Sequence, residues 1–375
     1  MSFKAGRVFG VTIRVHYTLL FIFFLIVWSL AMGYMPQQFP GLSPIRYWII
    51  GTISGFILLL SVVIHELCHS IVAIKLGLPI KRITLFFLGG AAEMAEEPKR
   101  PDVEFKMALV GPLSSFAIAA LFGGLWYIFK TVSLSVELLA IAQYGAVINL
   151  ILGGFNLLPA FPMDGGRIFR SIAWKYMRSM IKATQLATKL SVGFAYAMMF
   201  GGFLMIIFRG LFNGLWIIFI GWFIKSGAEA GLSQTIITQA LSGTTVSEIM
   251  SSDVVTVDFD TPLHRLVTEY FLTRKFAGYP VRKDGAVVGM VTMDQVKRIP
   301  RPLWEKTAVR DVMKPLGELV IVEPETPASD AFYKMSRKDE GRILVMKNGE
   351  LNGIVSRKDF THLIKTKIDL EYGLT

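Results

Sequence analysis

Cysteine is almost absent from this chain, which has one, Cys68, among 375 residues. A single cysteine excludes an intrachain disulfide and is compatible with a reducing, cytosolic side. Charged residues are also scarce, at 18%, whereas hydrophobic residues make up 53%. This balance is typical of an integral membrane protein. The hydrophobic residues are concentrated before about residue 228, and the rest reads as an ordinary soluble sequence.

Two features that would indicate other classes of protein are missing. The sequence has no compact basic patch with interleaved aromatic residues, so we expect no nucleic acid partner despite a net charge of +11. Basic cytosolic loops of a membrane protein give the same total charge. We also expect no cleavable secretory signal, because the first apolar run is too long and no small-residue cleavage site follows it.

Six apolar segments are long enough to enter or cross a bilayer, which takes about 20 apolar residues. They cover approximately residues 17–35, 48–75, 105–129, 138–158, 188–208 and 211–227. Lys and Arg are frequent before the first segment and in every second connection after it, and rare in the others. Because cytoplasmic loops carry the excess of positive charge, we predict a multi-pass protein of the cell membrane with both termini cytosolic.

The second apolar segment contains His65-Glu66-Leu67-Cys68-His69. Residues four apart lie on one face of a helix, so the two histidines can bind one metal ion with the glutamate beside them. Polar groups are costly inside a bilayer, so an intramembrane cluster of this kind is a candidate functional site. The alternative is a histidine pair that shares buried hydrogen bonds with the glutamate. The apolar surroundings favour the metal site.

A catalytic zinc ion usually has three protein ligands and one open position. The best candidate for the third ligand is Asp164, in a stretch where Pro159 and Pro162 interrupt the fourth apolar segment. These prolines predict unwound backbone, which is tolerated at membrane depth where it lines a wet cavity. By itself, Asp164 would be better explained as the N-cap of a helix starting near Arg167. Beside the paired histidines, the role of metal ligand is favoured.

Together, His65-Glu66-x-x-His69 and the Asn/Pro/Asp-Gly stretch around Asp164 resemble the site-2 protease family of intramembrane zinc metalloproteases. The resemblance implies that the two histidines and the aspartate are zinc ligands and that Glu66 is the general base. It also implies a catalytic role for Asn156, which would polarise the scissile carbonyl. A helix–helix hydrogen bond is the alternative role for that asparagine.

The resemblance covers about residues 1–228 and includes two weaker points. One is a β segment thought to hold the substrate, whose exposed edge could pair with an unwound substrate helix. The residues that would bind substrate are Gly89, Gly90 and Ala91. The other is a Gly-Pro step at Gly111. Ser114 and Ser115 follow that step, which departs from the family's pattern. It therefore stays open which side chain the third apolar segment contributes to the site.

The tail contains an internal repeat. Residues 289–292 (GMVT) recur 64 positions later as residues 353–356 (GIVS). Each unit reads as a strand, an Asp-Gly or Asn-Gly turn, a second strand and a helix. Over about residues 243–366 the tail resembles a tandem CBS pair, also called a Bateman module.

A CBS pair implies adenosine nucleotides as ligands, here ATP, ADP or AMP. In the family signature, a Ser or Thr hydroxyl meets phosphate and an Asp three residues later holds ribose. The second repeat has both, as Ser356 and Asp359, whereas the first has Thr292 followed by Gln295. We therefore expect at most one good site. A purely structural or dimerising module is the alternative, and a homodimer through the CBS domains is expected.

The predicted fold is a polytopic α-helical membrane domain of about six transmembrane helices, followed by a cytosolic α/β tandem CBS domain. The expected parts are a metalloprotease domain, a linker, two CBS repeats and a tail, at residues 1–228, 229–243, 244–300, 307–366 and 367–375.

The predicted function is regulated intramembrane proteolysis. The substrates would be single-span membrane proteins, such as tethered transcription regulators, cleaved in or near their transmembrane segments under the control of adenine nucleotide. Membrane lipid is a further expected partner. A CBS-regulated transporter or channel is the alternative, and an inactive metal-binding scaffold is another. We see neither an ion path nor an internal transmembrane repeat, and the intact Glu66 argues against an inactive protein.

Overall fold

The computed structural model describes residues 2–8, 10–78, 80–86, 89–94, 98–274 and 276–372. The chain divides into two compact units, Met1–Ser233 and Gln234–Thr375. In the described part of the chain, six helices are long and apolar enough to cross a membrane, which confirms the predicted number. They are Tyr17–Gln38, Pro44–Lys75, Pro101–Thr131, Val136–Asn156, Met180–Phe208 and Gly214–Leu241.

The helices of the first unit begin at residues that favour helix starts. Pro44 and Pro101 are the first residues of two long helices, where the missing N–H would have no partner in any case. Ser179 caps another helix, because its Oγ accepts a hydrogen bond from Lys182 N at 3.3 Å. The helical elements are α1 (Tyr17–Ser29), η1 (Leu30–Tyr34), α2 (Met35–Gln38), α3 (Pro44–Lys75), α4 (Pro101–Thr131), α5 (Val136–Asn156), α6 (Asp164–Met177), α7 (Met180–Arg209) and α8 (Leu211–Leu241).

The first unit also contains a four-stranded sheet, of which the sequence predicted only one segment. The strands β1 (Ser2–Val8), β2 (Val11–His16), β3 (Ile80–Phe86) and β4 (Gly89–Met94) lie in this order. β2 and β3 are parallel, and the other neighbours are antiparallel. Alternation along β2 buries Val11 and Ile13, which pack with Ile83 of β3 and Leu67 of α3. The sheet therefore lies against the helix that carries the paired histidines.

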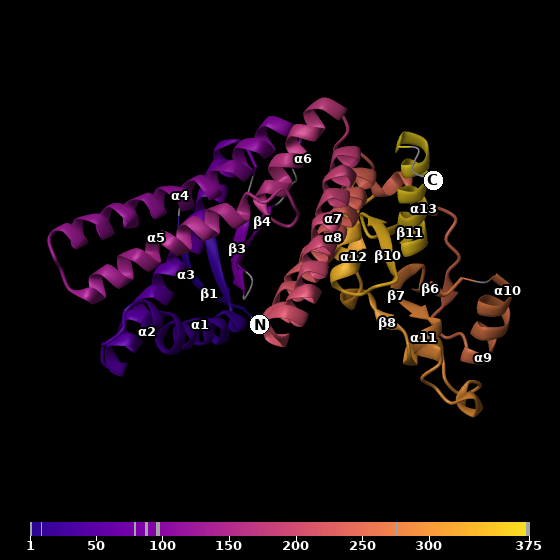
Figure 1. Cartoon of the computed structure of the whole chain (residues 1–375). Helices are drawn as coiled ribbons and strands as arrows, with labels where there is room; N and C mark the ends of the chain where they lie inside the picture. The colour runs from indigo at the N-terminus through magenta and orange to yellow at the C-terminus, as the bar shows by residue number, and fades with distance from the viewer. Residues whose placement is uncertain are drawn as a thin grey trace. The chain divides into compact units, whose positions relative to one another are not determined.

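Helices α3 to α6 enclose the region around those histidines. α4 and α5 form a long antiparallel hairpin (Figure 1), and α3 packs against both of them. The chain leaves the helical conformation after Asn156 and resumes it at Asp164, in the stretch where two prolines predict unwound backbone. The short helix α6 then packs against α4 and α7.

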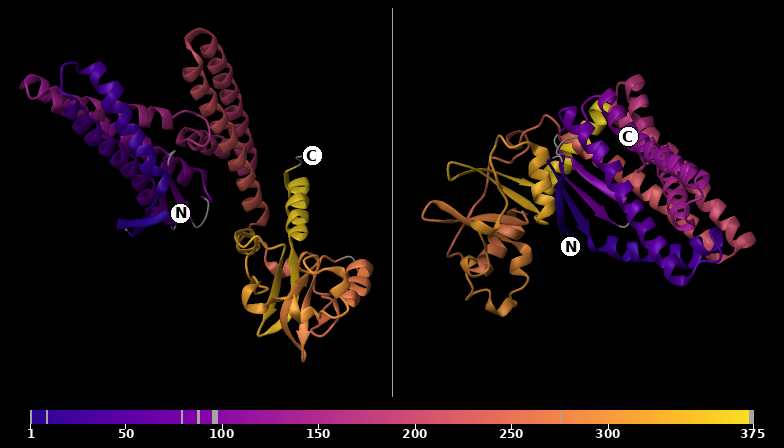
Figure 2. Two further views of the ribbon diagram at one scale, coloured as in Figure 1. Left: turned by 90° about the horizontal axis from the view of Figure 1, so that it is seen from below. Right: turned by 90° about the vertical axis from the view of Figure 1, so that its left-hand side faces the viewer.

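α7 and α8 form a second hairpin, which runs side by side in both views of Figure 2. Gly210 connects the two helices with a φ of 97°, a conformation that favours glycine. An added Cβ at Gly202 of α7 would lie 2.8 Å from the Gly214 carbonyl oxygen of α8, and one at Gly214 would overlap the Gly202 carbonyl oxygen. Paired glycines thus let the two backbones approach closely, as small residues do between membrane helices.

The second unit contains the same arrangement twice. In each repeat, a short strand pairs in parallel with the first strand of an antiparallel hairpin. The Asp284-Gly285 and Asn348-Gly349 turns have positive φ, as the sequence pattern predicts. The elements are η2 (Val246–Glu248), β5 (Val257–Asp258), α9 (Leu263–Arg265), η3 (Leu266–Phe271), α10 (Leu272–Arg274), β6 (Gly278–Lys283), β7 (Ala286–Thr292), α11 (Met293–Val296), η4 (Arg301–Leu303), η5 (Val309–Asp311), β8 (Lys314–Pro315), η6 (Leu316–Glu318), β9 (Ile321–Val322), α12 (Ala328–Arg337), β10 (Arg342–Lys347), β11 (Glu350–Ser356), α13 (Arg357–Lys367) and η7 (Ile368–Tyr372).

The two repeats exchange their opening segments. Val246, which opens the first repeat, donates its N–H to Thr326 O at 2.9 Å and is buried in the core of the second repeat. Val309, which opens the second, donates to Thr261 O at 2.9 Å and is buried in the core of the first. The linear repeat in the sequence does not reveal this exchange, because each opening segment precedes its own repeat in the chain.

α8 extends beyond the predicted sixth apolar segment as far as Leu241. The stretch 229–243, expected as a linker, is therefore helical over most of its length. Leu241 is 1% exposed and belongs to the core of the second repeat. Residues 373–375 of the predicted tail lie outside the described residues.

The glycine contact between α7 and α8 predicts a position-specific effect on stability. A Gly202→Leu substitution should lower the free energy of unfolding by about 1–3 kcal/mol, because the side chain must force the helices apart. Gly201 has open space around it, so Gly201→Leu is the matched control. Thermal unfolding in detergent micelles measures both, and equal melting temperatures would contradict the close contact.

Candidate metal centre

The paired histidines lie on the buried face of α3. Buried positions along this helix recur every three or four residues, and His65 and His69 are two of them. The two residues are 4% and 7% exposed, and the ring centroids are 4.8 Å apart. The HExxH spacing therefore places both rings together, as one turn of helix predicts.

Asp164, the first residue of α6, lies opposite the two rings. Its Oδ2 is 3.0 Å from His65 Nε2 and 3.1 Å from His69 Nε2, and the residue is 8% exposed. One ligand atom from each of the three residues lies within 4.8 Å of the other two. The N-cap residue of α6 is Met163. Asp164 is therefore not the helix N-cap, which was the alternative role considered for it.

The loop before α6 is held in place by backbone contacts. An added Cβ at Gly165 would overlap the Leu157 carbonyl, so the Asp-Gly-Gly sequence allows α6 to start directly against the loop. Phe161 N donates to Ser191 Oγ of α7 at 2.8 Å. The direction in which Asp164 leaves the loop is therefore fixed from two sides.

The outer nitrogen of each histidine ring has a partner on α4. His69 Nδ1 lies 2.6 Å from Met107 O, and because a carbonyl oxygen only accepts, Nδ1 carries the proton. In the neutral ring, the lone pair is then on Nε2, which faces Asp164. His65 Nδ1 lies 2.9 Å from Ser115 Oγ. Ser115 is thus the side chain that the third apolar segment contributes. The Met107 carbonyl could not be found from the sequence, because a backbone atom leaves no residue-specific signal.

Gly111 of α4 faces the same two ring nitrogens that approach Asp164. An added Cβ there would overlap His69 Nε2 and lie 2.7 Å from His65 Nε2. Because Gly111 has no side chain, both ring nitrogens can lie against the α4 backbone where the three ligand atoms converge. The Gly-Pro step drew attention to this helix, but the sequence did not indicate that the glycine itself borders the site.

The two predicted catalytic residues have different surroundings. Glu66 is partly buried on α3 and interacts electrostatically with His65 and Asp164. Asn156 is the last residue of α5, and its Nδ2 donates to Leu152 O of the same helix at 2.9 Å. The structure therefore brings Glu66 to the three ligand residues and leaves the Asn156 amide bonded to its own helix.

The predicted substrate-binding residues belong to β4, which lies at one edge of the sheet and contacts α3. In the described part of the chain, the outer side of β4 has no strand partner. Gly89, Gly90 and Ala91 pair with Phe86, Leu85 and Thr84 of β3.

The residues at this centre fit a zinc ion. Two imidazoles and one carboxylate form a donor set of catalytic zinc sites, and such a set leaves one position for water. Hydrogen-bond partners at Nδ1 fix both rings, an arrangement typical of metal-binding histidines. Gly111, which lets both rings lie directly against α4, and the neighbouring Glu66 complete the features that a hydrolytic site requires.

The predicted nucleotide-binding residues lie at two equivalent helix starts in the second unit. Asp359 Oδ2 accepts hydrogen bonds from Ser356 N and Ser356 Oγ, both at 2.7 Å. In the first repeat, Gln295 Oε1 accepts from Thr292 N at 2.7 Å and from Thr292 Oγ1 at 3.1 Å. The signature residues of each repeat therefore form a reciprocal helix cap.

Arg342 was not selected from the sequence, yet it interacts with acidic residues at both caps. It pairs with Ser356 across β10 and β11 and is electrostatically coupled to Asp294 and Asp359. Burial lowers the pKa of its guanidinium, and the two carboxylates act to raise it. An added Cβ at Gly278 of the first repeat would lie 3.3 Å from Arg342 Nη1. The repeat aligns these two positions without revealing that they lie close together.

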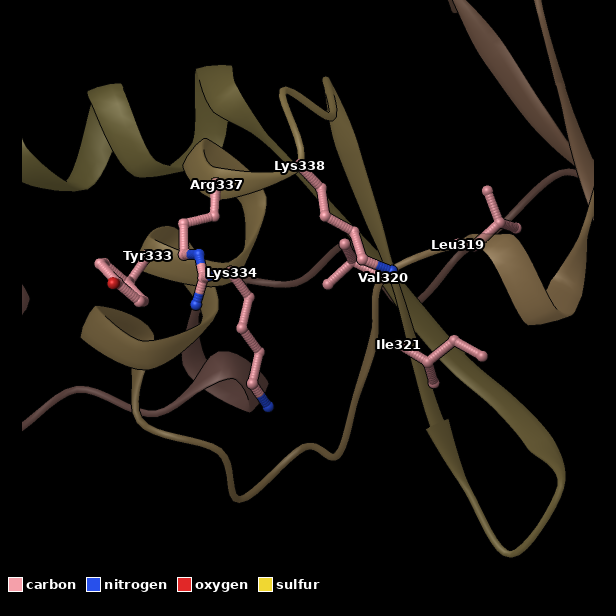
Figure 3. Close-up of a pocket in the computed structure, with 7 residues that line it drawn as sticks. All are labelled: Leu319, Val320, Ile321, Tyr333, Lys334, Arg337 and Lys338. Carbon is pink, nitrogen blue, oxygen red and sulfur yellow. The ribbon is translucent and has the colours of Figure 1, made fainter. Parts of the chain in front are cut away.

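A hollow of about 480 Å³ lies between α12 and the chain leading into β9 (Figure 3). Its lining combines three cationic side chains with one aromatic and three aliphatic residues. They are Lys334, Arg337, Lys338, Tyr333, Leu319, Val320 and Ile321. The predicted nucleotide-binding residues are not part of this lining.

Comparison with known proteins identifies the family. The model of Peptidase family M50 matches residues 54–135 and 122–200, which include all three candidate ligands. The Rip3 protein of Mycobacterium tuberculosis is 30% identical over 361 residues, covering 96% of this chain and 92% of that protein. The chain belongs to the site-2 protease family. The family that its N-terminal motifs predict is therefore confirmed.

The likeness extends along the whole chain. Zinc metalloprotease MJ0392 of Methanocaldococcus jannaschii is 31% identical over 358 residues, covering 96% of this chain and 94% of that protein. A solved site-2 protease from the same organism matches 61% of this chain and 94% of its own, with 31% identity and a TM-score of 0.43. The CBS domain model matches residues 246–301 and 309–366.

This membership confirms three predictions from the sequence. The protein is a metalloprotease, it is a multi-pass membrane protein, and its tail is a tandem CBS pair. A transporter and an inactive scaffold were the alternatives, and the family assignment favours neither of them.

The geometry at Gly111 yields a prediction about metal binding. A Gly111→Ala substitution should weaken zinc binding by at least about 10-fold, because the new methyl group displaces the ring nitrogens. Gly124→Ala, on the same helix but in open space, should bind zinc as wild type does. Zinc content of the purified variants and competition with a chelator measure the difference. Wild-type affinity in Gly111→Ala would show that the glycine does not border the metal.

Proposed function

We propose that this site-2 protease hydrolyses peptide bonds in or near the transmembrane segments of membrane-tethered substrates. The observation that carries the proposal is the meeting of His65, His69 and Asp164 ligand atoms between helices long enough to span a membrane. Buried ionisable groups in such helices indicate function. Single-span proteins, including tethered transcription regulators, are the proposed substrates.

In the proposed mechanism, His65, His69 and Asp164 hold a zinc ion. When bound, zinc lowers the pKa of a water molecule to about 7 and polarises the peptide carbonyl. Glu66 would accept a proton from a water molecule that attacks the carbonyl carbon, and would then deliver the proton to the leaving amine. The Met107 carbonyl and Ser115 keep both imidazoles in orientation throughout.

Asn156 is the proposed donor to the developing oxyanion. Its amide nitrogen now bonds to Leu152 O, so it must rotate about its side-chain bonds to reach a substrate. Its position at the end of α5, where the helix unwinds, supports this role.

β4 is the proposed binding element for the substrate backbone. A substrate helix must unwind before its peptide bond is accessible, and an extended segment can then pair with the free edge of Gly89–Ala91. The contact of β4 with α3, which carries Glu66, supports this proposal.

The sheet also supports the predicted topology. β1 and β2 precede the first span, and β3 and β4 follow the second, yet all four strands form one sheet. Because one sheet cannot lie on both faces of a membrane, both segments lie on the same side. The positive charges of these segments make the cytosol the proposed side, and the C-terminal CBS pair, after six spans, shares it.

For the CBS pair we propose regulation by an adenine nucleotide at the second repeat. Ser356 would contact phosphate, Asp359 would hold ribose and Thr292 would contribute from the first repeat. The cationic Arg342, coupled to Asp359, supports an anionic ligand here. A nucleotide can alter activity only if it binds two states of the protein with different affinity. A homodimer through the CBS pair stays a prediction.

The mechanism predicts separate effects on catalysis and metal binding. Glu66→Gln should lower kcat at least about 10³-fold because no base accepts the proton of the attacking water. It should retain wild-type zinc, whereas His65→Ala should lose it. Cleavage of a transmembrane substrate in proteoliposomes gives the rate, and elemental analysis gives the metal content. Equal cleavage by wild type and Glu66→Gln would refute the mechanism.

The nucleotide proposal has its own matched pair of variants. Asp359→Ala should weaken ATP, ADP or AMP binding by at least about 10-fold, because ribose loses its hydrogen-bond partner. Gln295→Ala removes the equivalent helix cap of the first repeat, so it controls for the loss of a cap alone. Isothermal titration of the full chain compares the two. Undiminished binding by Asp359→Ala would place the nucleotide elsewhere, with the hollow beside Arg337 as the next candidate.

A further inference from the structure

A buried ion pair joins α4 to α6 close to the metal centre. Glu104 of α4 is fully buried, and Arg170 of α6 is 7% exposed. Arg170 Nε donates to Glu104 Oε1 at 2.9 Å, and Nη2 of the same guanidinium contacts that oxygen as well. Arg167 Nε lies 3.7 Å from it. The proposed mechanism assigns no role to these charges.

The ion pair and the metal centre are separated by a similar distance along α4 and along α6. On α4, Glu104 precedes Met107 by one turn and Gly111 by two turns, or about 10 Å at 1.5 Å per residue. On α6, Arg170 follows Asp164 by six residues, or about 9 Å. The ion pair therefore lies about 10 Å along both helices from the residues at the metal centre.

Arg170 also contacts the loop that leads to Asp164. Its guanidinium carbon lies 5.3 Å from the centroid of the Phe161 ring. Phe161 N is itself bonded to Ser191 of α7. One arginine thus links the loop before Asp164, the helix after it, and the helix that orients both histidines.

Stability alone is a poor explanation for this pair. The free-energy cost of removing both charges from water offsets most of their attraction. Apolar residues of similar size often stabilise a buried site equally well. Apolar contacts lack direction, however, whereas a guanidinium and a carboxylate fix distance and orientation together. A site that must hold a ligand atom in place gains from that directionality.

We infer that Glu104 and Arg170 are positioning residues that set the rotation and height of α6, and with them the place of Asp164 Oδ2 opposite the two histidines. The inference rests on the proposed role of Asp164 as a metal ligand. Glu104 and Arg170 act only through α6 and the Phe161 loop. Their loss should therefore reduce metal affinity and kcat while leaving KM nearly unchanged.

The test replaces the ion pair by apolar side chains, so that no lone charge is buried. The full-length double variant Glu104→Leu/Arg170→Met is purified in detergent and compared with wild type by thermal unfolding, chelator competition for zinc, and kinetics at saturating zinc. We expect a melting temperature close to that of wild type, zinc affinity lower by about 10–100-fold, a lower kcat and an unchanged KM. Arg170→Lys, which keeps the charge but not the planar fork, should have intermediate zinc affinity.

A second interhelical pair supplies the control. Arg46 Nη1 lies 3.1 Å from Glu137 Oε1 and joins α3 to α5 at the far end of α3 from the histidines. Glu137→Gln should leave zinc affinity and kcat at wild-type values. An equal loss in this control would overturn the inference, because any interhelical ion pair would then have the same effect.

The outcomes separate this inference from the proposed metal site. If Asp164→Asn binds zinc as wild type does, the metal site itself is wrong and the inference fails with it. If Asp164→Asn loses zinc but the folded double variant keeps wild-type affinity, only the positioning role is overturned. Should the double variant not fold, wild-type zinc affinity in Arg170→Lys would overturn it instead.

Discussion

Two imidazoles and a carboxylate meet among membrane helices, where a polar group without a partner is costly. Much of the first unit is arranged to meet that requirement. α4 supplies the Met107 carbonyl, the Ser115 hydroxyl and Gly111, which has no side chain to keep the rings away, all on one buried face. The unwound stretch before α6 brings the carboxylate to the rings. Positions that appear unremarkable in a hydropathy profile therefore determine whether the two histidines can act together.

The metal centre shows how far the sequence alone could lead. His65, Glu66 and His69 lie in one helical turn, so their proximity follows from the geometry of the helix. Asp164 lies far along the chain. The proline-interrupted apolar segment around it and the need for a third ligand indicated it, and the family resemblance supported that choice. The Met107 carbonyl could not be predicted, because a backbone atom has no residue-specific signal. The ion pair of Glu104 was also missed, since pairing across 66 residues depends on tertiary packing.

The CBS pair shows a different limit. The 64-residue repeat and its turns predicted the hairpin strands of both CBS repeats, because Asp-Gly and Asn-Gly turns are strong local signals. The exchange of Val246 and Val309 between the cores is a property of how two similar units pack, and either arrangement is compatible with the same periodic sequence. Arg342 illustrates the consequence: it occupies the position equivalent to Gly278, and its guanidinium lies beside that glycine of the other repeat.

The sheet of the first unit also constrains how the protein is made. Thr12 of β2 pairs with Arg82 of β3, and the two spans α1–α2 and α3 lie between them in the chain. The parallel pairing can form only after residues 80–86 have been synthesised, and by then both spans have been synthesised as well. Until then, the β1–β2 hairpin lacks the strand that completes its sheet. Completion of this sheet therefore follows synthesis of both spans, so the edge strand β4 beside α3 belongs to a finished sheet only after that point.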